Sequence, residues 1–83
     1  MGKTKISVIG LGFVGLPLAV SNAKKKFMTV AVDNNQSKIN NLKQSKIDFF
    51  EPHLDSMLKS TIKSNKIEFT TNIKNMFKYI III

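Results

Sequence analysis

Short apolar runs alternate with amphipathic segments along this chain. Runs rich in Ile and Val predict β-strands at 5–9, 28–32, 66–70 and 79–83. Apolar residues at helical spacing predict helices over about 13–26 and from 52 to 62. A helix between them is predicted to follow an N-cap at Asn34 or Asn35 and to end at about Lys43. A short helical turn is expected between 71 and 77, so the predicted order is β-α-β-α-α-β-α-β.

This order predicts the fold class. Continuous apolar strands that alternate with helices are typical of a parallel sheet covered on both faces. We therefore predict an α/β fold, a partial Rossmann-type doubly wound parallel sheet that is truncated inside its fourth strand. The expected strand order is 3-2-1-4, which places the fourth strand across the switch point from the first.

A glycine-rich segment joins the first strand to the first helix. Gly10, Gly12 and Gly15 form the pattern G-x-G-x-x-G, and Asp33 ends the second strand 23 residues after Gly10. Gly10 permits the tight turn, Gly12 lets a pyrophosphate approach the backbone, and Gly15 allows close packing of helix on strand. The helix N-terminus offers N–H donors to that pyrophosphate. The Asp33 carboxylate would accept hydrogen bonds from a ribose and repel a 2′-phosphate, so the sequence predicts NAD over NADP.

Other polar residues carry weaker signals. Lys38 lies one turn into the second helix, where spacing alone favours a solvated lysine. His53 is the only histidine, and we predict a surface residue at a helix start rather than a catalytic residue. Glu51 and Asp55 suit a helix N-terminus through its dipole. We therefore predict no catalytic residue and no metal site in this chain.

Composition changes this picture little. The 83 residues carry 13 basic and 5 acidic side chains, a net charge of +8, but every basic residue is a lysine and the lysines are scattered. A biased codon usage explains this better than a nucleic-acid partner, which usually needs arginine. The absence of cysteine excludes disulfides, thiolate metal sites and a cysteine nucleophile within the chain.

The N-terminal apolar stretch is similar to a signal peptide, but Pro17 and the glycines disfavour that interpretation. We therefore expect a cytoplasmic protein without a membrane partner.

The residues around the glycines extend into a more specific pattern. Residues 5–19, KISVIGLGFVGLPLA, resemble the opening of the nucleotide-sugar 6-dehydrogenases, which act on UDP-glucose or UDP-N-acetylmannosamine. Glu51-Pro52 followed by Leu54 is similar to the family's E-P-x-L element, and 67–71 to the strand after it. The resemblance covers nearly the whole chain. It departs from the family at Phe13, where tyrosine is frequent, and at Lys26, where glycine commonly ends the helix.

The resemblance implies a reaction and a set of cofactor contacts. The family oxidises the C6 alcohol of a UDP-sugar to a carboxylate with two NAD, and a homo-oligomer is compatible with the full-length form. Its cofactor contacts correspond here to Gly10, Leu11, Gly12, Phe13, Val14, Gly15, Asp33 and Lys38.

Length sets a limit on what the chain does alone. Family members run to several hundred residues, and their nucleophilic cysteine, lysine and asparagine lie beyond position 83. We expect residues 1–83 to be the N-terminal part of a dinucleotide-binding domain, without substrate and catalytic domains and inactive alone. The UDP-sugar would then be a partner of the full-length protein only.

Two other functions remain open at this stage. One is the first half of another NAD-dependent dehydrogenase, of the 3-hydroxyacyl-CoA or 6-phosphogluconate type, although Glu51-Pro52 and the helix after it argue against it. The other is a non-enzymatic basic module that binds nucleic acid, which predicts strongly salt-dependent binding.

Overall fold

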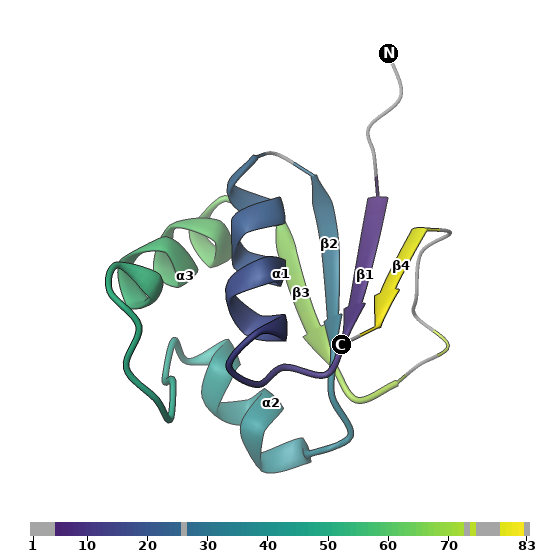
Figure 1. The fold of residues 1–83 in the computed structure, drawn as a ribbon, viewed down its shortest axis with the longest axis horizontal. Helices are drawn as coiled ribbons and strands as arrows, with labels where there is room; N and C mark the ends of the chain where they lie inside the picture. The colour runs from purple at the N-terminus through teal and green to yellow at the C-terminus, as the bar shows by residue number, and fades with distance from the viewer. Residues whose placement is uncertain (1–4, 26, 73, 75–78, 83) are drawn as a thin grey trace.

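Four parallel strands form one sheet. The computed structural model describes residues 5–25, 27–72, 74 and 79–82. The strands pair in the order β3-β2-β1-β4, and each neighbouring pair is parallel (Figure 1). Their bounds are β1 Lys5–Ile9, β2 Met28–Val32, β3 Ile67–Thr70 and β4 Tyr79–Ile82. The predicted parallel α/β sheet and its strand order are confirmed.

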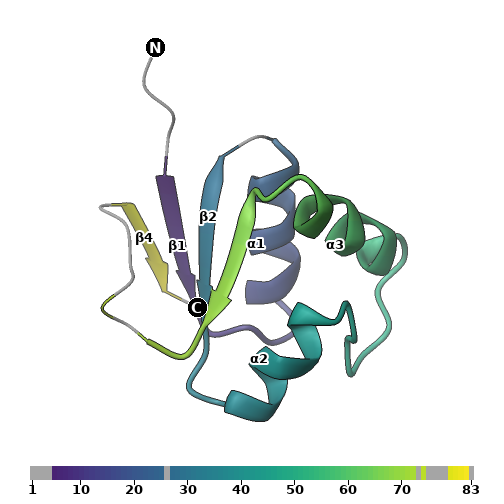
Figure 2. The same ribbon diagram turned by 180° about the vertical axis from the view of Figure 1, so that it is seen from behind.

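Three helices lie against one face of this sheet. They are α1 (Gly15–Lys24), α2 (Gln36–Lys43) and α3 (Leu54–Lys63). Figures 1 and 2, seen from opposite sides, both place them on the same side of the strands, with α1 beside α3. Most of the turn predicted over 71–77 lies outside the described residues, so the predicted cover on the second face is not tested. The predicted helix end at Lys26 and the strand end at Ile83 also lie outside them.

The core forms between the helices and the inward side of the sheet. Alternate residues Ile6 and Val8 of β1 lie beside Ala31 of β2 and Phe69 of β3, and α1 and α3 cover them. The predicted stripe on α3 is confirmed, because Leu54, Leu58 and Thr61 are buried while Met57 and Ile62 are half-buried against the core. β2 is buried from residue 29 to 32, as expected of a central strand in a parallel sheet.

The first and third helices begin two residues later than predicted. Phe13 and Val14 form a turn before α1, and Val14 is the N-cap. His53 is the N-cap of α3 and has a φ of 67°, a left-handed conformation that cannot continue a helix backwards to Pro52. The bounds of α2 agree with the prediction, because the Asn35 side chain accepts a hydrogen bond from the Lys38 N–H at 3.0 Å.

None of the helices in the described part of the chain has both the length and the apolar character required to cross a membrane.

Candidate functional site

The glycine-rich loop turns the chain from β1 into α1. Gly10 has a φ of 94°, a conformation that L side chains rarely adopt, and its N–H donates to the Val32 carbonyl at 2.8 Å. α1 then begins without a side-chain cap, because its N-cap residue is Val14. The first N–H groups of a helix have no intrahelical partner. In α1 the Leu16 N–H donates to the Gly12 carbonyl and Pro17 has no N–H. The helix therefore presents the Gly15 N–H and the positive end of its dipole at this loop.

The outer side of the loop is open. A Cβ placed on Gly12 would meet no atom within 4 Å. The next two side chains, Phe13 and Val14, are 76% and 63% exposed. Gly15 by contrast is buried in the first turn of α1. A ligand can thus approach the backbone at Gly12, while the far end of the loop stays packed.

Asp33 links the two loops that follow β1 and β2. Its Oδ2 accepts a hydrogen bond from the Leu11 N–H at 2.9 Å, and its Oδ1 accepts one from the Asn35 N–H, also at 2.9 Å. The Asp33 side chain is only 13% exposed. The Leu11 side chain is buried in the core, so this residue contributes to the site through its backbone.

Lys38 completes this link from the first turn of α2. Its Nζ donates to the Leu11 carbonyl at 3.2 Å and lies 3.9 Å from Asp33 Oδ2. Spacing alone favoured a solvated lysine, and the structure corrects this, since the side chain is 26% exposed and bonded to the loop. Leu11, Asp33 and Lys38 are thus brought together from three different segments.

A hollow of about 330 Å³ lies beside this cluster. It is lined by Ile9, Gly10, Val32, Asp33 and Asn34, at the carboxyl ends of β1 and β2. Figure 1 shows both arrowheads at the same edge of the sheet, with α2 beyond it. Ligands of open α/β sheets bind at this edge, at the point where strand order reverses. Here β1 has β2 on one side and β4 on the other.

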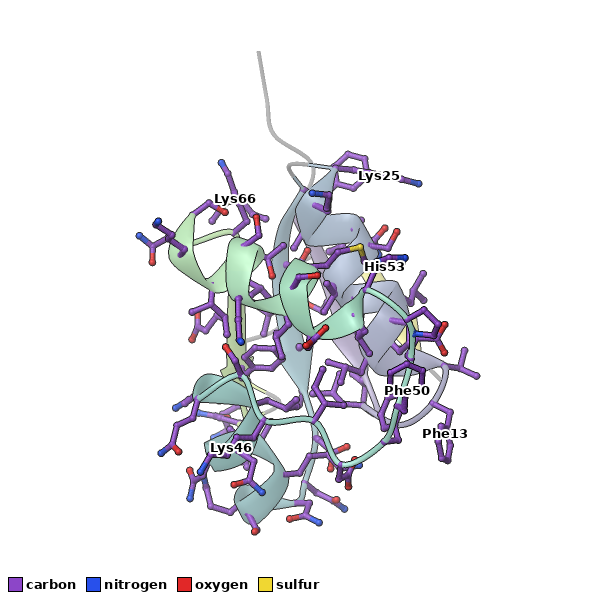
Figure 3. The ribbon with its side chains drawn as sticks, turned by 90° about the vertical axis from the view of Figure 1, so that its left-hand side faces the viewer. Phe13, Lys25, Lys46, Phe50, His53 and Lys66 are labelled. Atoms are coloured by element: carbon purple, nitrogen blue, oxygen red, sulfur yellow. The ribbon has the colours of Figure 1, made fainter. Side chains whose placement is uncertain are left out.

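The remaining candidates lie outside the cluster. His53 is exposed at the start of α3, as predicted, and Figure 3 shows it beside the chain that leads into that helix. Glu51 is exposed, and Asp55 lies in the first turn of α3. Within the described ranges, no three His, Asp or Glu side chains gather in a way that could hold a metal ion.

One contact of the loop was missed by the sequence reasoning. The Phe13 ring lies against the Phe49 ring, with centroids 4.7 Å apart and planes tilted by 53°. Phe49 belongs to the irregular segment between α2 and α3, where no periodicity marks an inward position. Asn34 was also missed as a residue lining the hollow.

Residues 4–83 match the NAD binding domain of the UDP-glucose/GDP-mannose dehydrogenase family. The chain belongs to this family. A UDP-glucose 6-dehydrogenase of Rhizobium meliloti is 40% identical over 70 residues, which are 84% of this chain and 16% of that protein. A UDP-N-acetyl-D-mannosamine dehydrogenase of Methanococcus maripaludis is 35% identical over 93% of this chain and 18% of its own length.

Solved structures of family members share the fold. The UDP-N-acetyl-mannosamine dehydrogenase of Staphylococcus aureus superposes with a TM-score of 0.88 at 31% identity, over 96% of this chain and 19% of that one. The UDP-D-ManNAc dehydrogenase of Pyrococcus horikoshii gives a TM-score of 0.90 at 27% identity, over 96% and 20%. The chain thus spans about a fifth or less of the relatives it matches. This membership favours a nucleotide-sugar dehydrogenase over the other NAD-dependent dehydrogenases and the nucleic-acid module considered above.

Proposed function

We propose that this chain binds NAD and forms the N-terminal part of the dinucleotide-binding domain of a nucleotide-sugar dehydrogenase. The observation that carries the proposal is the cluster of Leu11, Asp33 and Lys38 beside an uncapped helix N-terminus. Membership in a family defined by an NAD binding domain supports the same cofactor.

Each part of the site has a distinct task in this proposal. The backbone from Gly10 to Gly15, which includes Phe13 and Val14, receives the pyrophosphate at the start of α1. Asp33 accepts hydrogen bonds from the adenosine ribose in the hollow beside it. Lys38 holds the Leu11 carbonyl and lies near the Asp33 carboxylate, so it fixes both loops relative to each other.

The open backbone at Gly12 and the uncapped helix fit this cofactor. Bound NAD supplies the hydride-accepting nicotinamide. The residues of this chain bind and orient the cofactor, and none of them is assigned a proton transfer or a covalent step.

The activity of the whole protein is a further part of the proposal. Relatives named UDP-glucose 6-dehydrogenase and UDP-N-acetyl-D-mannosamine dehydrogenase support oxidation of the C6 alcohol of a UDP-sugar to a carboxylate with two NAD. We place the substrate-binding and catalytic residues outside residues 1–83, so this chain alone would not turn over. A cytoplasmic location and a homo-oligomeric full-length form stay predictions of this proposal.

Calorimetric titration with NAD and with NADP tests the cofactor assignment, using the protein at its full natural length. We expect NAD to bind at least about tenfold more tightly than NADP, because a 2′-phosphate would face the Asp33 carboxylate. Asp33→Asn keeps an oxygen that can accept from the Leu11 N–H but removes the charge. This variant should therefore have a smaller difference between its Kd for NAD and its Kd for NADP than the unmodified protein.

Two results would contradict the assignment. Equal affinity of the unmodified protein for NAD and NADP would remove the proposed role of Asp33. No binding of either dinucleotide would refute the proposed function itself.

A further inference from the structure

We propose that Phe49 is a positioning residue, which holds the loop from Gly12 to Val14 through the ring of Phe13 in the shape that receives the pyrophosphate. The proposal rests on the proposed function, since it concerns the same loop. It adds a residue from the segment between α2 and α3, outside the glycine-rich motif, Asp33 and Lys38.

The two ends of the glycine-rich loop are held by hydrogen bonds. At one end, the Leu11 N–H donates to Asp33 and the Leu11 carbonyl accepts from Lys38. On either side of Phe13, the Gly12 carbonyl accepts from the Leu16 N–H at 3.1 Å and the Val14 carbonyl accepts from the Leu18 N–H at 3.2 Å. Between these anchors the loop has no side-chain cap.

Phe13 lies in the middle of that span. Its side chain is 76% exposed, and Figure 3 shows it pointing away from the ribbon. An exposed phenylalanine does not fix a loop by burial. Its ring nevertheless lies 4.7 Å from the ring of Phe49, a separation at which aromatic pairs attract each other.

Phe49 is suited to hold this ring because it is anchored itself. It is half-buried and packs against the core that α1, α3 and the sheet share. The contact therefore extends the rigid core to the loop that carries the N–H donors. A dinucleotide site gains affinity when its donors are ordered before the ligand arrives, because less conformational entropy is then lost on binding.

The next residue provides a matched control. Phe50 is 87% exposed and lies in the same segment, near Phe13 in the view of Figure 3. Across the described part of the chain, the ring contact of Phe13 is with Phe49 and not with Phe50. The same substitution at 50 thus controls for the loss of an aromatic ring from this segment, and a double-mutant cycle with Phe13 separates the ring contact from the packing of Phe49 on the core.

NAD titration of the protein at its full natural length measures the effect. We expect Phe49→Leu, which keeps an apolar side chain in the core, to raise the NAD Kd about threefold to tenfold, since an aromatic pair contributes that much. Phe49→Tyr keeps the ring and should retain the affinity. Phe50→Leu should change the Kd by less than about twofold, as expected of an exposed side chain without this contact.

A double-mutant cycle tests whether Phe49 acts through Phe13. The variant with both Phe13→Leu and Phe49→Leu should lose less NAD affinity than the sum of the losses in the two single variants, because either change already removes the ring pair. Fully additive losses would overturn the proposal. Equal losses of NAD affinity in Phe49→Leu and Phe50→Leu would also overturn the proposal.

Hydrogen exchange of the amides from Gly12 to Gly15 in the unliganded protein supplies a readout that does not need NAD. Exchange should speed up by about threefold to tenfold in Phe49→Leu and stay unchanged in Phe50→Leu. If the unmodified protein binds no NAD, the proposed function fails, and this measurement still decides whether Phe49 orders the loop. If NAD binds but both affinity and exchange are unchanged in Phe49→Leu, the positioning role alone is refuted.

Discussion

At the scale of single residues, Gly12 is a position where a substitution should weaken NAD binding without disturbing the fold. An added Cβ would meet nothing within 4 Å, and the residue does not have a positive φ, so alanine fits the fold. The same methyl group would stand where the pyrophosphate must approach. We therefore expect Gly12→Ala to raise the NAD Kd at least about tenfold while hydrogen exchange in α1 stays unchanged.

Gly10→Ala is the contrasting variant. Gly10 has a φ of 94°, which is strained for any L residue. The Gly10→Ala protein should therefore be less stable to unfolding and also bind NAD more weakly. A Gly12→Ala protein that binds NAD as tightly as the unmodified one would show that the pyrophosphate does not approach at Gly12.

Residue by residue, the sequence predicted the parts of the site that depend on local pattern. The three glycines and Asp33 could be placed because a strand, a turn and a helix fix their relation. Lys38 was selected by the family resemblance, since its bond to a carbonyl 27 positions away follows from tertiary packing. The ring pair of Phe13 and Phe49 has no local signal either, because both residues lie in irregular segments.

At the scale of elements, the stability of the first turn of α2 affects the site, because this turn carries Lys38. Asn35 is the N-cap of this helix. Removing such a cap costs about 1 kcal/mol, which corresponds to roughly a fivefold change in an opening equilibrium. Asn35→Ala should therefore speed hydrogen exchange in α2 about fivefold.

The neighbouring asparagine is the control for that measurement. Asn34 is exposed and does not cap the helix, so Asn34→Ala should leave exchange in α2 unchanged. Similar exchange in both variants would mean that the Asn35 side chain does not hold the first turn.

The element boundaries show why local signals succeed in some places and fail in others. The ends of α2 were predicted because a capping residue and the apolar spacing agree. α3 begins later than predicted, because His53 adopts a left-handed conformation that residue type does not reveal. α1 also begins later than predicted, although Val14, its N-cap, has dihedral angles in the right-handed helical region. The strand order was predicted because parallel strands joined by helices have few possible arrangements.

At the scale of the whole molecule, the net charge of +8 is distributed rather than focused. Figure 3 shows Lys46 at the opposite end of the view from Lys25 and Lys66. Lys38, which lies in the proposed cofactor site, donates to the Leu11 carbonyl and lies 3.9 Å from Asp33. A nucleic-acid duplex is bound by a continuous basic surface, whereas a dinucleotide needs a few oriented donors.

This distribution leads to a prediction that tests the remaining alternative function. With a short DNA duplex and a single-stranded RNA as probes, we expect only weak binding at 50 mM salt, which disappears by 200 mM. Non-specific phosphate contacts lose affinity steeply over this range, because counterions compete for the same charges. NAD binding should change much less, since it depends on oriented hydrogen bonds to one pyrophosphate and one ribose. Tight nucleic-acid binding that persists at 200 mM salt and is displaced by neither NAD nor NADP would instead support a basic module with a surface of its own.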